Sequence, residues 1–313
     1  MYQFLDSEPV RKEKRLIWAV NRSVMENIGF VPIKRGKKSK SHWNLFVFLL
    51  KIFTILLKIT GYYQKGYGNA KTINVNELTL KFPNLPAAFN GFKILHLSDL
   101  HIDSIPGFTS LIIEKVTSLT FDVCLLTGDY RRDINGSFSH ILKPLHILSK
   151  YIQAPEGTFA VLGNHDTYLM ARYEQESGMK LLVNESVEIL KDGDKILITG
   201  TDDPFSFYTD DALLCLETKG YDFKIAMVHT PELAKVASRR KYDLYLCGHT
   251  HGGQICLKEG SPLLSHQFEG KQFNHGKWNI GSMTGYTSRG VGVSGMPVRF
   301  NCEAEITLIT LEK

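Results

Sequence analysis

The chain has 313 residues, of which 43% are hydrophobic and 22% are charged. That balance excludes an intrinsically disordered or low-complexity protein, and the length suits one large catalytic domain with an accessory segment. The five cysteines form no CxxC pair, which argues against a disulfide framework and against a zinc–thiolate site.

The formal net charge of +5 is unevenly spread along the chain. Residues 1–63 hold 12 Lys or Arg and 4 Asp or Glu, a net charge of +8, so the remainder has a net charge of −3. Residues 1–40 are polar and basic and end in a basic run at 34–40. A basic run beside an apolar stretch favours an anionic membrane surface over nucleic acid. We therefore expect a membrane contact through residues 34–63 and no nucleic-acid partner.

The apolar stretch is residues 43–63, WNLFVFLLKIFTILLKITGYY. It begins too late for a signal peptide and is long enough to span a bilayer. Lys51 would then lie near the middle of the membrane, where a lysine costs about 2.5–3.5 kcal/mol. Lys51 and Lys58 are seven residues apart and share a helix face, which favours a helix lying in the membrane interface. The alternative is an amphipathic helix packed on the protein's own surface.

We divide the chain into residues 1–70, a basic N-terminal segment with the membrane-associated helix, and residues 71–313, a catalytic domain. In the second part, short runs rich in Ile, Leu and Val alternate with helical patterns, which predicts an α/β domain with a largely buried sheet. The predicted strands are 71–82, 92–98, 122–126, 158–162, 187–191, 195–200, 223–228, 243–247 and 305–311. The predicted helices are 109–119, 138–151, 168–180, 209–218 and 231–240.

Residue types that bind metals follow five of the predicted strands. In chain order they are Asp99 and His101, Asp129, Asn164 with His165 and Asp166, His229, and His249 with His251. Ligands bind outside the carboxyl ends of strands in open α/β sheets, so these side chains are expected to converge. Mixed oxygen and imidazole ligands suit Mn²⁺, Fe²⁺ or Zn²⁺. The Asp-x-His and His-x-His spacings let each segment aim two ligands at one site.

The blocks DLH, GD, GNHD, an isolated His before a helix, and GHTHGGQ resemble, in that order, the signature of the calcineurin-like metallophosphoesterases. The resemblance covers about residues 72–313 and implies a two-sheet β-sandwich flanked by helices, here preceded by the membrane-associated helix. The stretch YTSRGVGVSGMPVRFN is similar to a subgroup of small bacterial enzymes. That subgroup includes the UDP-2,3-diacylglucosamine pyrophosphatase of chlamydial type and YkuE/YaeI-like phosphodiesterases.

The resemblance also implies roles for the residues of these blocks. Two divalent metal ions are expected, Mn²⁺ first, with Fe²⁺ or Zn²⁺ as alternatives. The implied ligands are Asp99, His101 and His251 for the first ion, Asn164, His229 and His249 for the second, and Asp129 for both. His165 would face the substrate phosphate as the catalytic acid, oriented by Asp166. A turn-capping carboxylate is the competing interpretation of Asp166.

Other polar residues near these blocks have simpler interpretations. His96 lies in the middle of a strand and is interpreted as a core histidine. Asp202 and Asp203 are interpreted as loop caps. Arg289 and Arg299 flank a glycine-rich stretch, where substrate phosphate binding and a structural role are equally compatible with the sequence.

The sequence thus predicts a metal-dependent hydrolase of phosphoester or pyrophosphate bonds on the cytoplasmic side of the inner membrane, peripheral or anchored by one helix. The resemblance to that subgroup, together with the apolar helix, implies UDP-2,3-diacylglucosamine, cleaved to lipid X and UMP in lipid A biosynthesis, as the first substrate hypothesis. The alternative is a general membrane-associated phosphodiesterase or phosphatase. A non-catalytic binding protein of the same fold is disfavoured, since proteins of that kind lose ligands and no expected ligand is missing here.

Overall fold

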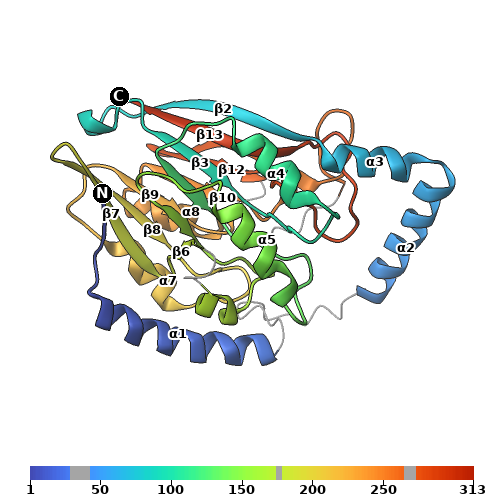
Figure 1. The fold of residues 1–313 in the computed structure, drawn as a ribbon, viewed down its shortest axis with the longest axis horizontal. Helices are drawn as coiled ribbons and strands as arrows, with labels where there is room; N and C mark the ends of the chain where they lie inside the picture. The colour runs from blue at the N-terminus through green and yellow to red at the C-terminus, as the bar shows by residue number, and fades with distance from the viewer. Residues whose placement is uncertain (29–42, 174–177, 264–272) are drawn as a thin grey trace.

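The computed structural model describes residues 1–28, 43–173, 178–263 and 273–313. The basic run at 34–40, predicted to contact a membrane, lies outside the described residues. The described chain forms two stacked β-sheets with helices on their outer faces (Figure 1). The predicted two-sheet sandwich of the α/β class is therefore confirmed.

One sheet has seven strands, in the order β1-β7-β8-β9-β10-β12-β11. Its inner strands β8, β9, β10 and β12 are parallel, and β1, β7 and β11 pair antiparallel at its margins. The bounds are β1 (Tyr2–Phe4), β7 (Glu185–Lys191), β8 (Asp194–Gly200), β9 (Lys224–Met227), β10 (Leu244–Cys247), β11 (Gly276–Ile280) and β12 (Met283–Thr287).

The other sheet has six strands, in the order β2-β13-β3-β4-β5-β6. Strands β3 to β6 are parallel, and β13 pairs antiparallel with β3 and parallel with β2. The bounds are β2 (Ile73–Lys81), β3 (Lys93–Leu97), β4 (Val123–Leu126), β5 (Thr158–Ala160), β6 (Lys180–Leu181) and β13 (Ala304–Glu312).

Three apolar clusters hold the layers together. Between the sheets, side chains of one sheet meet those of the other; examples are Ile94, Leu125 and Phe159 against Ile198, Ile225 and Leu244. Helices α4 (Phe108–Val116) and α5 (Ser139–Ser149) cover the outer face of the six-stranded sheet. Helices α7 (Asp210–Leu214) and α8 (Ala234–Arg239) cover the other sheet. Strands such as β4 and β9 are buried on both faces, which explains their continuous apolar sequences.

Residues 174–177 of the helix predicted over 168–180 lie outside the described residues, and the described parts on either side are not an α-helix. A 3₁₀ helix, η2, covers Tyr168–Tyr173, and Lys180–Leu181 form β6 instead. Gly178 has a φ of 68°, which ends any helix before β6, and the pairing of β6 with β5 satisfies backbone groups that a helix would use. Shorter 3₁₀ turns are η1 (Ala87–Phe89), η3 (Cys215–Glu217), η4 (Pro231–Leu233) and η5 (His251–Gly253).

The N-terminal residues contain two elements that the sequence did not predict. Strand β1 pairs with β7, and helix α1 (Glu8–Ile28) lies along one flank of the sandwich (Figure 1). Polar residues dominate α1, yet Trp18 and Arg22 on its inner face are buried. Residues 2–28 thus contribute a strand and a helix to the body assigned to residues 71–313.

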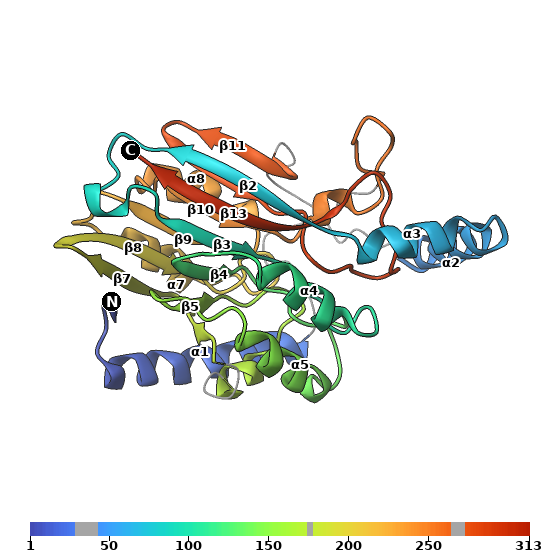
Figure 2. The same cartoon turned by 45° about the horizontal axis from the view of Figure 1, so that its top comes forward.

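The helix predicted over 43–63 is two helices. Helix α2 (Trp43–Ile59) ends before Gly61, whose φ of 76° breaks the helical path, and α3 (Tyr62–Lys71) follows. Both project from one end of the molecule (Figure 2). Within the described ranges, none of the helices combines the length and the apolar content that a membrane crossing requires.

Candidate metal centre

The candidate residues converge at the carboxyl ends of parallel strands from both sheets. Loops after β3, β4 and β5 carry Asp99 with His101, Asp129, and Asn164 with His165. Loops after β9 and β10 carry His229, and His249 with His251. Each sheet therefore supplies part of one site, and the structure brings all seven expected metal ligands together, in two groups.

The first group is Asp99, His101 and His251, whose ligand atoms all lie within 4.8 Å of one another. The His251 Nε2 atom is 3.5 Å from Asp99 Oδ1 and 3.1 Å from His101 Nε2. Asp99 and His101 are fully buried, and His251 is 6% exposed. Three donor atoms thus meet in a space from which bulk water is largely excluded.

The second group is Asp129, His229 and His249. The His229 Nε2 atom is 3.3 Å from Asp129 Oδ2. The Asn164 Oδ1 atom lies 3.0 Å from His229 Nε2 and 2.9 Å from His249 Nδ1, which places the amide in the same group. Asp129 Oδ2 is also 3.8 Å from His101 Nε2, so this carboxylate lies between the two groups.

Backbone carbonyls orient two of the imidazole rings. The His101 Nδ1 atom is 2.7 Å from the Arg131 carbonyl, and the His229 Nδ1 atom is 2.7 Å from the Thr127 carbonyl. When each Nδ1 donates its proton to a carbonyl, each Nε2 carries a lone pair. Those lone pairs face other acceptors, such as the carboxylate of Asp129. Lone pairs of imidazole nitrogens and carboxylate oxygens repel each other unless a cation lies between them. The residues present therefore fit divalent metal ions.

The electrostatics of His101 and Asp99 agree with that fit, whereas the pKa of His229, which burial lowers, is raised well above its usual value by the carboxylates around it, Asp129 first. Burial, aided by nearby His165, lowers the pKa of His101 to about 4, so the ring is neutral, as a metal ligand must be. Burial also raises the pKa of Asp99 to about 6, which measures the cost of keeping this carboxylate charged away from water. A cation beside Asp99 offsets that cost.

The backbone at the site is strained. Five of the seven expected ligands have a positive φ, from 34° at His101 to 72° at His249; the others are Asp99, Asp129 and His251. Such conformations cost about 1–3 kcal/mol each and persist where the surroundings over-determine them. Gly163 and Gly248 permit this packing, because a Cβ at either would lie 2.2 Å from a carboxylate oxygen of Asp129 or Asp99.

His165 borders the second group without joining it. Its Nε2 atom is 3.9 Å from Asp129 Oδ2, and its side chain is 13% exposed, so the ring is open to a ligand. Its Nδ1 atom faces the Arg132 carbonyl, not Asp166. The Asp166 carboxylate instead accepts hydrogen bonds from the backbone N–H groups of Gly163, Asp129 and Tyr130. The expected orientation of His165 by Asp166 is therefore replaced by the turn-capping role.

The remaining polar candidates have structural roles or lie in a different pocket. His96 is buried, with Nε2 2.9 Å from Thr127 Oγ1, as expected for a core histidine. Asp203 accepts from the backbone N–H groups of Phe205 and Ser206, which makes it a loop cap. Asp202 also accepts the backbone N–H of Asp203, but its main partners are on α1.

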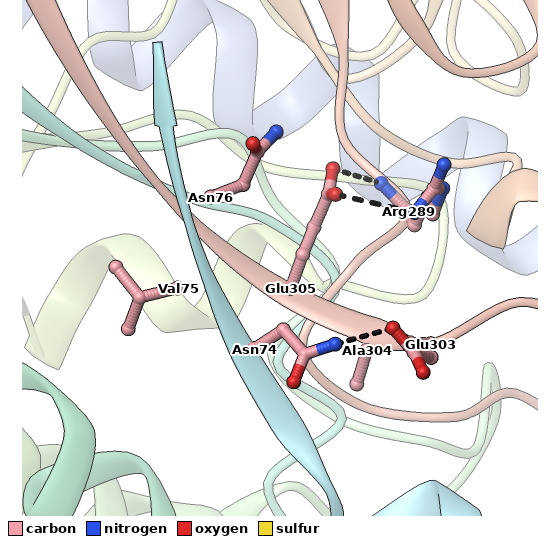
Figure 3. A pocket seen from close by; sticks show the side chains of 7 residues that line it. All are labelled: Asn74, Val75, Asn76, Arg289, Glu303, Ala304 and Glu305. Carbon is pink, nitrogen blue, oxygen red and sulfur yellow. Dashed lines mark hydrogen bonds and ion pairs between the residues drawn. The ribbon is translucent and has the colours of Figure 1, made fainter.

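The two arginines have different environments. Arg299 is fully buried and donates to the carbonyls of Arg289, Gly290 and Gly292, so it has a structural role. Arg289 lines a polar pocket beside β2 and β13, where its guanidinium is 4.0 Å from Glu305 (Figure 3). The backbone N–H of Arg289 also donates to Glu305.

Sequence reasoning missed a group of site-supporting residues on α1. Arg22 and Glu26 contact the loop that carries Asn164 and His165, and Trp18 contacts Asp202 on the loop after β8. Their spacing of four residues places them on one helix face, and this was the signal available in the sequence. Phe205, also missed, packs against His249 with 4.5 Å between ring centroids.

A family model described as calcineurin-like phosphoesterase matches residues 92–253, which include all the expected ligands. The chain belongs to this family. It is similar to the uncharacterized metallophosphoesterase YkuE of Bacillus subtilis, with 32% identity over 80% of this chain and 90% of that protein. It is also similar to the phosphodiesterase YaeI of Escherichia coli, with 32% identity over 70% of this chain and 82% of that protein.

A more distant relative is a protein of Danio rerio named transmembrane protein with metallophosphoesterase domain, which is 27% identical over 85% of this chain and 62% of that protein. This metallophosphoesterase is accordingly a metal-dependent hydrolase of phosphoester bonds. Its family uses divalent metals, and the two groups described above are the candidate ligand sets.

Proposed function

We propose that this metallophosphoesterase binds two divalent ions and cleaves a phosphoester or pyrophosphate bond in a lipid-linked substrate. The observation that carries the proposal is the position of Asp129 between two ligand sets, one buried and the other buried except for the half-buried His249. Asp99, His101 and His251 would hold one ion; Asn164, His229 and His249 would hold the other; and Asp129 would contact both. Oxygen and imidazole donors favour Mn²⁺, with Fe²⁺ and Zn²⁺ as alternatives.

Groups around His165 would then have separate roles in the reaction. When bound, two such ions supply Lewis acidity toward a water molecule and the phosphoryl oxygens. The backbone N–H of His165 donates to Asp129 Oδ1 at 2.9 Å, which fixes the position of this carboxylate. The accessible His165 ring donates a proton to the leaving oxygen. The Arg132 carbonyl, which faces Nδ1, directs the Nε2 side of the ring toward the site.

The exposed apolar side chains of α2 support a membrane contact. Phe48, Ile52, Ile55, Leu56 and Ile59 recur at helical spacing, with exposures from 39% to 77%. A helix of 17 residues with such a face suits the plane of the membrane interface. We propose that this contact lies on the cytoplasmic side. The relative from Danio rerio carries a transmembrane description in its name.

A protein that contacts a membrane surface is well placed to act on a substrate held in that surface. UDP-2,3-diacylglucosamine, cleaved to lipid X and UMP, is the first candidate, because its acyl chains hold it in the surface that α2 would contact. The second candidate function is a membrane-associated phosphodiesterase of broader specificity. The similarity to YaeI, which is named a phosphodiesterase, supports it.

The test uses the purified full chain with Mn²⁺ and two substrates. The first is UDP-2,3-diacylglucosamine in mixed micelles, and the second is bis(p-nitrophenyl) phosphate. We expect UMP and lipid X from the first and nitrophenol from the second. Nitrophenol without UMP would favour the second candidate function. Absence of both products from a metal-loaded sample would contradict the proposal.

A further inference from the structure

Arg22 of α1 is a buried cation outside the candidate metal centre. Its side chain is 1% exposed, and its guanidinium lies over the Phe207 ring at 3.3 Å from the ring centroid. The Nε atom donates to Glu26 Oε1 at 3.0 Å, and Nη1 donates to Asp202 Oδ1. Because a buried charge is costly unless it is paired and fully hydrogen-bonded, this set of partners needs an explanation.

The second Nη atom of Arg22 reaches the loop after β5. It donates to the Gly163 carbonyl at 3.1 Å and to the Asp166 carbonyl at 2.9 Å. These two carbonyls flank Asn164 and His165. The planar guanidinium thus holds both ends of the segment that carries an expected metal ligand and the expected acid.

Glu26, one helical turn after Arg22, binds the continuation of the same segment. Its Oε2 atom accepts from Thr167 Oγ1 at 2.7 Å, and its Oε1 atom accepts from the Tyr168 backbone N–H at 2.8 Å. Together, Arg22 and Glu26 contact residues 163–168 at four points. The Gly163 carbonyl also accepts the Asp166 backbone N–H at 3.2 Å, and the Asp166 side chain accepts three backbone N–H groups, so the contacts from α1 add to bonds that already hold the loop after β5.

The contact between Arg22 and Asp202 also connects α1 to a second expected metal ligand, His249. Trp18 Nε1 donates to Asp202 Oδ2 at 2.7 Å, so two residues of α1 fix this carboxylate. The loop continues through Asp203 to Phe205, whose ring packs on His249. One guanidinium therefore links the two loops that border Asn164 and His249.

We infer that Arg22 is a positioning residue of this metallophosphoesterase, which sets the geometry of Asn164 and His165 through the backbone of residues 163–166. Helix α1 is then required for full turnover although it contributes no residue to the two candidate ligand groups. The inference rests on the proposed roles of Asn164 and His165, so its test includes a measurement that needs no turnover.

The test compares Arg22→Lys with Arg15→Lys. Lysine keeps the positive charge beside Asp202, but a single ammonium cannot serve both carbonyls, Asp202 and Glu26. Arg15 is a matched control, because it lies on the same helix and holds Glu185 with a similar fork, at 2.8 Å and 3.0 Å. We measure kcat and KM on bis(p-nitrophenyl) phosphate at saturating Mn²⁺, the thermal midpoint, and Mn²⁺ affinity.

For Arg22→Lys we expect kcat to fall about 10–100-fold, as for the loss of groups that orient metal ligands, with KM nearly unchanged. For Arg15→Lys we expect kcat within about twofold of wild type at a comparable thermal midpoint. Equal falls in the two variants, or a wild-type kcat in Arg22→Lys, would overturn the inference. Glu26→Gln, at a partly exposed residue, is a second variant that weakens the contacts of α1 with the same segment. We expect it to lower kcat less than Arg22→Lys does.

Mn²⁺ affinity separates this inference from the proposed function. If wild type hydrolyses neither of the two substrates, the proposed function fails, and the affinity for the Mn²⁺ expected at Asn164, His229 and His249 still tests Arg22. We expect that affinity to fall in Arg22→Lys and to hold in Arg15→Lys. Equal affinities in the two variants would overturn the inference whatever the turnover.

Discussion

The strand-end loops and helix α1 meet at residues 163–168, where they act by different physical means. The loops bring carboxylates, an amide and imidazole rings together, so they concentrate negative charge and lone pairs that a metal ion neutralises. Helix α1 brings its own cation, Arg22, which neutralises Asp202 and binds backbone carbonyls. The strand-end loops supply the metal ligands and the acid, and helix α1 sets the geometry of the loop that carries Asn164 and His165.

This difference separates two kinds of mutational effect. Changes in the loops remove ligands or the acid, and they are expected to abolish metal binding or turnover. Changes in α1 leave every ligand in the chain and are expected to reduce turnover by smaller factors. Loop variants compared with Arg22→Lys test that ordering, and they are taken from the largest expected effect to the smallest.

Replacement of Asp129 by alanine is expected to have the largest effect. Asp129 lies between both ligand groups, so its loss weakens both metal sites at once. We expect kcat/KM to fall by on the order of 10³-fold or more, since the ions supply several kcal/mol of charge stabilisation. Metal content measured by elemental analysis should fall as well. A variant that keeps two ions per chain would show that Asp129 is not shared.

Replacement of His165 by alanine is expected to separate catalysis from metal binding. Its ring faces the site but belongs to neither ligand group. Turnover should fall about 10²–10⁴-fold, the usual contribution of a positioned acid, while the metal content stays at the wild-type level. Metal loss equal to that of Asp129→Ala would assign His165 to the ligands instead.

A methyl group at Gly163 is expected to disturb the junction of the two regions. Its Cβ would lie 2.2 Å from Asp129 Oδ1 and 2.7 Å from the Asp129 backbone nitrogen, so the loop or the carboxylate must move. We expect Gly163→Ala to lose metal affinity and turnover by about 10–100-fold. Gly68→Ala is the control, because nothing lies within 4 Å of a Cβ there. Similar activity in the two variants would contradict the packing argument.

Charges on the exposed face of α2 are expected to affect only the membrane contact. Ile55→Asp with Leu56→Asp should weaken co-sedimentation with anionic vesicles and leave hydrolysis of a soluble phosphodiester at the wild-type rate. Ile147→Asp, at an exposed apolar residue of α5, is the control and should bind vesicles as wild type does. Unchanged sedimentation of the α2 variant would remove the support for a lipid surface.

The loops were predictable from the sequence because their signal is local. Asp99, Asp129, His229 and His249 each follow a short apolar run, and the two-layer fold brings the ends of such runs together. The role of Asp166 was harder to assign, because a carboxylate beside His165 can orient the ring or cap the turn. Backbone geometry, with three N–H groups aimed at the carboxylate, decides it.

The role of α1 was not predictable by the same route. Arg22 and Asp202 are 180 residues apart, and the four-residue spacing of Trp18, Arg22 and Glu26 marks one helix face without showing that this face is buried. The break between α2 and α3 depends on a positive φ at Gly61, although an isolated glycine is tolerated in many helices. The contacts of Arg22 depend on tertiary packing, and the break at Gly61 depends on a backbone conformation that the sequence permits but does not require.

The central claim is that seven side chains hold two ions with Asp129 between them. Crystals of the full chain soaked in Mn²⁺, measured at an energy where manganese scatters anomalously, test it directly. We predict two peaks about 3.5–4 Å apart, one beside Asp99, His101 and His251 and the other beside Asn164, His229 and His249. A single peak, or two peaks that do not share Asp129, would contradict the account.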